Sequence, residues 1–373
     1  MNRVPAVVVV AYDRPASLDR LLSSLKSAQY NVTDIPLVIS IDGGANSEVI
    51  QAAEDFEWNN GEKKVITHQE NLGLKAHVMS CGRLSKDYGA VIVLEDDLVV
   101  SPLYYQYAVE ALTYCADDQS IAGISLFSYH IKEFKHLPFI PLEDGADNYF
   151  LQVPSSWGQI WTASQWADFE NWMDQKVNYD SVRVPTPVAK WSDQSWKKDF
   201  IYYLVDQHKF FFYPRVSFTT NFGDAGVNHK GEFARYQVPI SLGKRSFQFQ
   251  KLSESIAKYD VFFEWLGLTE KEYQGLEFDL YGEKPSFLDE TQLVLTTRKV
   301  KNAIATFQAT MLPLEANYLH KVEGQGINLA RKEDVILSKR PMSPEIHERL
   351  VGQYSKQRHW IQYLYTLKSE LGL

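Results

Sequence analysis

The sequence contains little cysteine, no long apolar run and no concentration of basic residues. Only two of its 373 residues are cysteines, Cys81 and Cys115, and their separation indicates neither a disulfide framework nor a thiolate metal site. No stretch of about 18 apolar residues is present, so we expect no membrane span. The net charge of −9 is spread along the chain, whereas a nucleic-acid-binding protein would show a basic patch. These absences predict a cytoplasmic protein with no nucleic-acid partner.

Short apolar runs alternate with amphipathic segments through the first hundred residues. We expect strands at residues 6–11, 36–41, 64–68 and 90–94, and helices at residues 17–28 (with Ser17 as N-cap), 48–57 and 74–85. This alternation predicts an α/β, Rossmann-like fold whose mostly parallel central sheet is flanked by helices. Ligands of such sheets bind outside the carboxyl ends of the strands, where the loop at Tyr12 and the turn at Asp42 lie.

Three consecutive carboxylates, Glu95, Asp96 and Asp97, follow the apolar run 90–94 and precede a second apolar run at 98–100. We call them the acidic triplet. Adjacent carboxylates repel one another unless a positive charge lies between them, and carboxylate oxygens are the ligands that hard divalent cations prefer. The acidic triplet therefore predicts a site for a divalent cation and a diphosphate at the edge of the sheet. The alternative is a solvated acidic turn.

Residues 150–215 are rich in tryptophan. They carry six of the nine tryptophans, which are Trp157, Trp161, Trp166, Trp172, Trp191 and Trp196. Core packing is the simplest interpretation of any one of them, but aromatic faces also stack against sugars and nucleobases, and so large a cluster favours at least one at a ligand site. Asp193 lies within this cluster. Farther on, the glycine-containing stretch 222–233 carries Asp224 and His229, and it is either a loop that folds over a ligand or an ordinary surface loop.

The remaining elements are less distinctive. We expect a turn leading into a helix at residues 155–161, helices at 102–115, 300–312 and 343–371, and strands at 121–127, 210–218 and 293–297. The last helical segment is basic and amphipathic, a pattern typical of helices that lie on anionic membrane surfaces. An ordinary docking helix is the alternative.

Several segments taken together resemble one family. They read VVVVAYDRPASLDRLLSSL, VISIDGG, ENLGL, LEDDLVVSP, SSWGQIWTASQW, WSD and FGDAGVNHKGEF, in this order. They are similar to nucleotide-diphospho-sugar glycosyltransferases of the GT-A type, and most of all to the N-acetylglucosaminyltransferase I family and its bacterial relatives. The resemblance covers residues 4–235. It implies a GT-A catalytic domain at residues 1–237 and a smaller C-terminal accessory region at 238–373, of mixed α/β or mainly α structure.

The resemblance also implies roles for individual residues. Asp97 would ligate Mn²⁺ or Mg²⁺, Asp96 and Glu95 would contact the ribose and the donor sugar, and Asp42 would accept a hydrogen bond from uracil. Around the donor we expect Ala11, Tyr12, Arg14, Trp157 and His229. Asp193 would be the catalytic base, with its pKa raised by the aromatic setting, and Asp224 and Glu232 are the reserve candidates.

The activity that the resemblance implies is a metal-dependent, inverting transfer from a UDP-sugar such as UDP-GlcNAc. The acceptor would be a hydroxyl of a glycan or lipid-linked glycan in bacterial surface polysaccharide synthesis. The family's members carry a membrane anchor, whereas this sequence shows none, so we expect a cytoplasmic enzyme, with peripheral contact at the inner face of the membrane. Two alternatives remain open: a sugar-1-phosphate nucleotidyltransferase and a non-catalytic sugar-binding module.

Overall fold

A computed structural model describes residues 4–175, 179, 182–224, 236–243, 246–268, 273–338 and 342–351. These residues form two compact units. The first comprises the described parts of Met1–Ser128 and Glu143–Val261, and the second those of Tyr129–Leu142 and Phe262–Leu373. The units therefore divide after Val261 and not at the expected boundary of residue 237. The reason is that Phe247 and Phe249 pack around Tyr107 in the core of the first unit.

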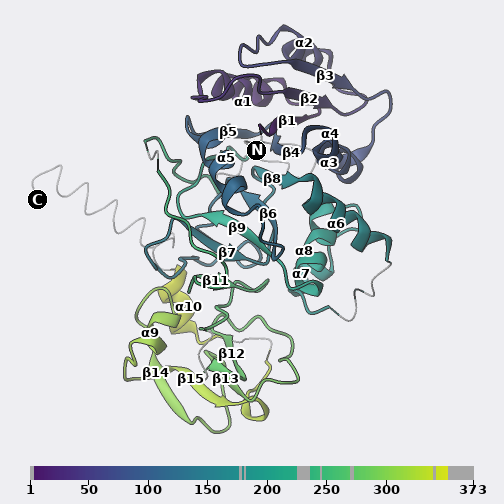
Figure 1. Cartoon of the computed structure of the whole chain (residues 1–373). Coiled ribbons are helices and arrows are strands. Elements are labelled where there is room, and N and C mark those ends of the chain that lie inside the picture. Colours follow the sequence, from purple (N-terminus) through teal and green to yellow (C-terminus); the bar gives the residue numbers. More distant parts are fainter. Residues whose placement is uncertain are drawn as a thin grey trace, which may run out of the picture. The chain divides into compact units, whose positions relative to one another are not determined.

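A nine-stranded sheet forms the centre of the first unit (Figure 1). Its strands, in spatial order, are β11 (Lys258–Tyr259), β7 (Asn148–Leu151), β9 (Phe210–Pro214), β6 (Ile121–Ser125), β8 (Gln159–Thr162), β4 (Ala90–Glu95), β1 (Ala6–Ala11), β2 (Leu37–Ile41) and β3 (Lys63–Thr67). The pairs β4–β1, β1–β2, β2–β3, β6–β9 and β11–β7 are parallel. The prediction of an α/β fold with a mostly parallel central sheet is confirmed.

Helices cover both faces of this sheet. Val7, Val9 and the other residues of the same strand face share one core with α1 (Pro15–Ser27), α2 (Ser47–Asp55) and α5 (Tyr104–Tyr114). On the opposite side α3 (Gly73–Arg83), α6 (Ala163–Asp174) and α8 (Trp196–Asp206) contact one another, beside the short helices α4 (Ser85–Tyr88) and α7 (Thr186–Ala189). A separate antiparallel pair, β5 (Leu98–Val100) with β10 (Thr219–Asn221), lies directly after the acidic triplet.

Three local predictions, two in the first unit and one in the second, were wrong. Ser17 is not the N-cap of α1, because the helix begins at Pro15 and the Ser17 hydroxyl donates a hydrogen bond to Asp224 at 2.7 Å. The segment after Trp157 forms the strand β8 before α6 begins, since it pairs with β4 and β6. Residues 300–312 are not helical, because Ala305–Gln308 forms β14 and pairs with β15 (Gly326–Arg331). Strand pairing with distant partners overrides the local pattern in the last two segments.

The second unit is mixed α/β. Its four-stranded sheet has the order β12 (Leu276–Asp279), β13 (Leu293–Thr296), β15, β14, and it is accompanied by α9 (Glu315–Leu319), α10 (Pro344–Val351) and the 3₁₀ turn η4 (Lys332–Asp334). Its interior contains two buried ion pairs: Arg298 Nε lies 2.5 Å from Asp279, and Lys284 Nζ lies 2.9 Å from Glu277. β13 confirms the strand expected at 293–297. Of the basic helical segment expected at 343–371, Pro344–Val351 forms α10, and residues 352–371 lie outside the described residues.

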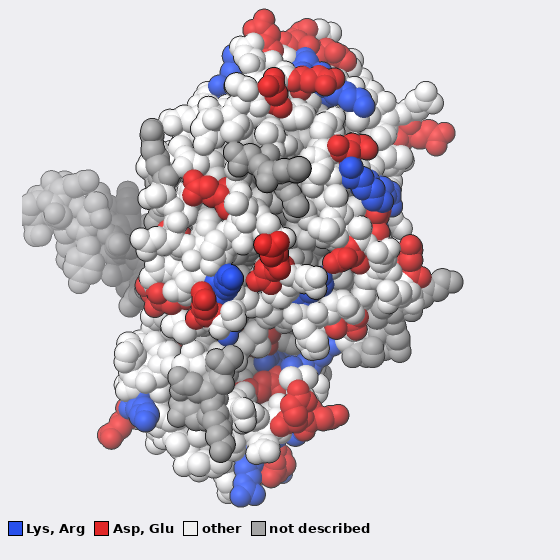
Figure 2. Space-filling model, in the orientation of Figure 1, with Lys and Arg blue, Asp and Glu red and all other residues white. Residues whose placement is uncertain are grey.

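The surface carries both signs of charge. On the face shown in Figure 2, Lys and Arg side chains are interspersed with Asp and Glu over the described residues. Within the same described part of the chain, no helix combines the length and the apolar character needed to cross a bilayer.

Candidate functional site

The carboxyl ends of β1, β2 and β4 meet at one edge of the sheet. The Asp42 N–H donates to the Ala11 carbonyl at 3.0 Å, and the Asp96 N–H donates to the Val10 carbonyl at 3.1 Å, so these two residues lie on either side of the end of β1. This edge brings together seven of the predicted site residues, namely Ala11, Tyr12, Arg14, Asp42, Glu95, Asp96 and Asp97. The predicted gathering of distant segments at one strand edge is therefore what the structure shows.

Arg14 supplies positive charge to the acidic triplet. It occupies the N-cap position of α1, and its guanidinium forms ion pairs with Asp96 and, at 3.1 Å, with Asp97. Sequence reasoning placed Arg14 beside the base and ribose and expected a metal ion between the acids. In the structure the cation between two of them is a side chain, because α1 starts only four residues after β1 and so points Arg14 back at the strand edge.

Burial shifts the pKa values of two acids of the triplet, Glu95 and Asp96. Burial, reinforced by the charges of Asp97 and Asp96, raises the pKa of Glu95 well above its ordinary value. The charges of Arg14 and Lys197 oppose this shift. Burial likewise raises the pKa of Asp96 to about 6, against the attraction of Arg14. Any added positive charge would therefore stabilise the ionised forms of Glu95 and Asp96.

Asp97 has a carboxylate oxygen that fits a metal ligand. Its Oδ2 faces Arg14, whereas its Oδ1 is buried and has no hydrogen-bond partner among the described residues. In that same part of the chain, no three His, Cys, Asp or Glu side chains lie close enough together to hold a metal by themselves. Mg²⁺-type sites are often built from one or two carboxylates completed by substrate phosphates and water. Asp97 therefore suits a cation that arrives with a diphosphate.

Asp42 fixes the start of helix α3. Its Oδ1 accepts the N–H groups of Gly43 at 2.8 Å and Leu72 at 2.7 Å, and its Oδ2 accepts that of Gly73 at 3.1 Å. A Cβ at Gly43 would lie 2.1 Å from the carbonyl carbon of Glu70, so the turn after β2 requires glycine for this close approach. The Asp42 carboxylate thus joins the turn at residues 42–44 to the turn at residues 71–73, where α3 begins.

His77 was missed by the sequence analysis. From α3 its Nε2 lies 2.8 Å from the Ser40 hydroxyl, which also contacts His68 at 3.2 Å. Burial lowers the pKa of His77 to about 4; the charge of Asp42 raises it and that of His68 lowers it further. In the sequence His77 is a single histidine in a helical apolar pattern, and nothing in that pattern predicts its contact with Ser40 of β2.

We expect His77 to make the protein less stable in acid. Its folded pKa of about 4 is below the ordinary value near 6.5, so only the unfolded chain binds this proton between those pH values. The free energy of unfolding should therefore fall by about 2–3 kcal/mol as pH drops from about 6.5 to 4. Denaturant titrations should show a flatter pH dependence for His77→Gln. His208→Asn, at an exposed histidine, is the control, and equal slopes in all three proteins would contradict the expectation.

Asp193 lies in the turn between α7 and α8, and its environment differs from the prediction. The side chain is 92% exposed, and its Oδ1 accepts a hydrogen bond from Lys198 at 2.8 Å. The hydrogen bond and the charge of Lys198 lower the pKa of Asp193, so the expected rise was wrong. The reason is that Trp196 is buried in the core and does not cover the carboxylate. Lys75 of α3 donates to the Asp193 carbonyl at 2.7 Å, which ties this turn to the helix that Asp42 holds.

Most of the clustered tryptophans are core residues. Trp161, Trp166, Trp172 and Trp196 are buried. Trp157 is only partly buried: it stacks on Tyr236 with ring centroids 4.3 Å apart, and Lys197 Nζ lies 5.3 Å from its ring centroid. Trp191 is also only partly buried. Trp157, which was expected around the donor, remains a candidate for a role at the site.

The stretch at 222–233 is described only at its start. Asp224 accepts a hydrogen bond from Ser17 and pairs with Arg20, whose guanidinium lies 4.0 Å above the Phe222 ring. Residues 225–235, which include the predicted His229 and Glu232, lie outside the described residues. As a reserve base Asp224 is already engaged by two donors.

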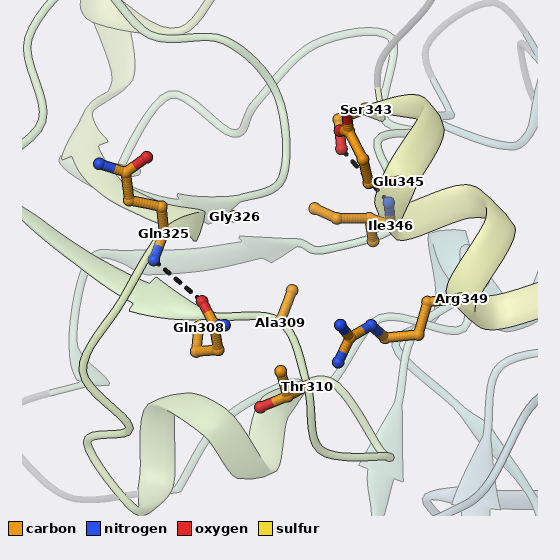
Figure 3. A pocket seen from close by; sticks show the side chains of 9 residues that line it. All are labelled: Gln308, Ala309, Thr310, Gln325, Gly326, Ser343, Glu345, Ile346 and Arg349. Atoms are coloured by element: carbon orange, nitrogen blue, oxygen red, sulfur yellow. Dashed lines mark hydrogen bonds between the residues drawn. The ribbon is translucent and has the colours of Figure 1, made fainter.

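The second unit contains a separate small pocket of about 220 Å³. Its lining includes Gln308, Gln325 and Arg349, and the Gln325 N–H donates to Gln308 Oε1 at 3.1 Å (Figure 3). None of the predicted site residues lines this pocket.

Several solved structures have a low similarity to this chain. They include the mannosyltransferase PcManGT from Pyrobaculum calidifontis in complex with GDP-Man and Mn²⁺ (10% identity, TM-score 0.33, 45% of this chain and 46% of that one). GalNAc-T7 with UDP, GalNAc and Mn²⁺ has 12% identity and a TM-score of 0.39, over 57% of this chain and 43% of that one. S. aureus TarS 1–349 with UDP has 13% identity and a TM-score of 0.37, over 57% and 59%. Scores below 0.5 are too low to transfer function.

The sequence comparisons are more specific. A curated relative, the alpha-1,3-mannosyl-glycoprotein 2-beta-N-acetylglucosaminyltransferase of Arabidopsis thaliana, is 26% identical over 263 residues, which are 64% of this chain and 51% of the relative. The chain thus spans about half the length of that relative. Residues 6–165 match the profile described as Glycosyl transferase family 2. These residues therefore form a glycosyl transferase family 2 domain, which confirms the predicted resemblance to the GT-A glycosyltransferases.

Proposed function

We propose that this chain is a metal-dependent, inverting glycosyltransferase that moves a sugar from a UDP-sugar to an acceptor hydroxyl. The observation that carries the proposal is the strand edge where Asp42 and the acidic triplet flank β1. There Asp97 Oδ1 is buried and has no hydrogen-bond partner in the part of the chain that the structure describes. The similarity to an N-acetylglucosaminyltransferase supports UDP-GlcNAc as the donor.

The base of the nucleotide would bind at Asp42. Three backbone N–H groups hold its carboxylate in place, and Oδ2 accepts only one of them. That oxygen therefore has room for the N3–H of uracil, which is a donor. Ala11 and Tyr12 lie between Asp42 and the acidic triplet, where a ribose would follow the base. This part of the site selects and positions the nucleotide.

The diphosphate would bind at the acidic triplet. Asp97 would ligate Mn²⁺ or Mg²⁺, and Asp96 and Glu95 would contact the ribose and the donor sugar. When bound, such a cation neutralises the charge that develops on the leaving diphosphate. Arg14 already lies against Asp96 and Asp97, so the chain contributes a cation of its own at the same edge.

The acceptor hydroxyl would lose its proton to Asp193. An inverting transfer needs one carboxylate that is ionised at the working pH. Asp193 meets this need, and Lys198 lowers its pKa further below the ordinary value. The lowered pKa makes Asp193 a weaker base but keeps it fully available at neutral pH. Lys75 holds its turn against α3, so acceptor and donor would meet between that turn and the strand edge.

The acceptor class and the cellular setting rest on the resemblance. We expect a hydroxyl of a glycan or lipid-linked glycan, in the synthesis of a bacterial surface polysaccharide. A cytoplasmic enzyme would meet such an acceptor at the inner face of the membrane. Liposome flotation of the full chain, and of a chain without residues 352–373, would test whether the basic C-terminal stretch contributes to this membrane contact.

Nucleotide release tests the proposed function. The purified chain is incubated with UDP-GlcNAc, UDP-Gal, UDP-Glc or GDP-Man, with Mn²⁺ or with excess EDTA. We expect UDP release that EDTA abolishes, and the largest release with UDP-GlcNAc. Formation of pyrophosphate from UTP and a sugar 1-phosphate would instead indicate a nucleotidyltransferase. Sugar binding without nucleotide binding would indicate a non-catalytic module.

A further inference from the structure

The pocket of the second unit is built from segments that are distant in sequence. Residues 308–310 at the end of β14, residues 325–326 at the start of β15, and four residues between 343 and 349 line it. Its volume of about 220 Å³ is below the roughly 300–1,000 Å³ of pockets that hold a drug-sized ligand. The pocket is therefore too small for a nucleotide-sugar, but it has room for a single sugar ring.

Arg349 brings a positive charge to this pocket. It lies one helical turn after Glu345 on α10, a spacing at which glutamate and arginine often pair. In the part of the chain that the structure describes, however, its guanidinium forms no ion pair and no hydrogen bond. Figure 3 shows it turned toward Ala309 and Thr310. A guanidinium placed in this way can bind a carboxylate through two parallel hydrogen bonds.

Gln308 adds a second hydrogen-bond donor. Its Oε1 accepts the N–H of Gln325 at 3.1 Å, which leaves Nε2 as the end of the amide that is available to a ligand. Figure 3 shows this nitrogen on the side of Ala309, the same side toward which Arg349 points. The donors of the pocket thus come from two different elements, β14 and α10, and converge on one place.

The rest of the lining is apolar and acidic. Ala309 and Ile346 are buried. A Cβ at Gly326 would lie 3.0 Å from Ala309 Cβ and 3.4 Å from Ile346 Cδ1, so glycine at this position keeps the space beside them open. The carboxylate of Glu345 can accept hydrogen bonds from hydroxyl groups, and it repels anions of high charge. A bare phosphate would leave the apolar wall uncovered, whereas a sugar ring with one carboxylate would cover it.

We propose that this pocket binds a carboxylate-bearing sugar, such as a hexuronic acid residue of a glycan. Arg349 and Gln308 Nε2 bind the carboxylate. The C–H face of the ring packs against Ala309 and Ile346, and Glu345 accepts hydrogen bonds from the ring hydroxyls. The inference goes beyond the proposed function, because none of the residues assigned to the donor or to the transfer lines this pocket.

Ligand-detected NMR titrations of the full chain test the proposal. The probes are methyl glucuronide, methyl glucoside and inorganic phosphate. We expect the wild type to bind the glucuronide with a Kd on the order of 1 mM, and at least about 10-fold more tightly than the other two probes. Arg349→Met should raise this Kd by about 10-fold or more, and Arg349→Lys, which lacks the planar fork, should lie between them.

Gln308→Glu provides a second variant that is independent of Arg349. It keeps the acceptor for the Gln325 N–H, so the turn before β15 should be undisturbed, but its added carboxylate repels that of the ligand. We expect the Kd of the glucuronide to rise by about 10-fold or more. Arg331→Met is the matched control, because Arg331 is an exposed arginine at the end of β15 that does not line the pocket. Its replacement should leave the Kd unchanged.

Three results would overturn the proposal. They are equal affinities for glucuronide and glucoside, unchanged glucuronide affinity in Arg349→Met, and tighter binding of phosphate than of glucuronide, which would indicate a simple anion site. Absence of binding to all three probes would likewise overturn it and would show that Arg349 is only solvated. These titrations need neither UDP nor Mn²⁺, so their outcome leaves the proposed function to its own test of nucleotide release.

Discussion

Replacing Asp193 with asparagine should lower turnover by about 10²- to 10⁴-fold, the contribution of a positioned general base. Asparagine has nearly the same size and can still accept the hydrogen bond from Lys198, so the turn that carries residue 193 should keep its structure. UDP affinity should stay within about twofold, because Asp193 is not at the strand edge that would hold the nucleotide. Steady-state rates with saturating donor and calorimetry with UDP measure the two quantities.

The control for this variant is Asp168→Asn. Asp168 is another exposed carboxylate paired with a lysine, with Lys209 Nζ at 3.2 Å, but it lies on α6 away from the turn. Its replacement should leave turnover unchanged. Near-wild-type turnover in Asp193→Asn would move the role of base to Asp224 or Glu232.

The pH profile should confirm which group titrates. Lys198, and to a smaller extent Lys75, lower the pKa of Asp193, so the carboxylate stays ionised to lower pH than usual. Activity should fall only as the pH drops through this lowered value. Lys198→Met removes the main cause, so the pKa rises and the acid limb of kcat/KM should move to higher pH. A limb that does not move in Lys198→Met would show that another group controls it.

Asp97→Asn should reduce Mn²⁺-dependent UDP binding by about 100-fold or more, since outer-shell changes alone typically cost 10- to 100-fold in metal affinity. The amide keeps the shape of the side chain but is a poor ligand for a hard cation. In excess EDTA the wild-type affinity should fall to that of the variant. Calorimetry with UDP, with and without Mn²⁺, provides the comparison.

Asp117→Ala is the control for Asp97, because Asp117 is an exposed acid in the turn after α5. It should bind UDP as wild type does. Equal UDP affinity of the wild type in Mn²⁺ and in excess EDTA would contradict metal dependence altogether.

The first half of the fold could be predicted because its signals are local. The strand expected at residues 6–11 is β1, since an uninterrupted run of alanine and valine suits a strand buried on both faces. Asp42 and the acidic triplet could be placed at strand ends because each directly follows such an apolar run. Parallel neighbours end at the same edge, so their convergence followed from topology alone.

Other parts of the site depend on contacts between distant segments. Arg14 was expected near the donor, but its ion pairs with Asp96 and Asp97 join residues more than 80 positions apart and could not be predicted from the sequence. The setting of Asp193 was misjudged because nearness in sequence does not imply contact: Trp196 is buried in the core, whereas Asp193 is exposed in the turn before α8. His77 was missed because its partner, Ser40, lies on a strand 37 residues earlier.

The pairing of β5 with β10 has a consequence for how the protein can be divided. The Asp97 carbonyl accepts a hydrogen bond from the Phe222 N–H at 3.1 Å, and Leu98 is paired with Asn221, so the turn at Asp97 is completed by a strand more than a hundred residues later. A fragment that ended at residue 165, where the family match ends, would leave β5 as an open edge and β6 without β9. The segment that matches the family, residues 6–165, is therefore shorter than the compact unit to which it belongs. A fragment that ends at residue 165 should aggregate and should not bind a nucleotide.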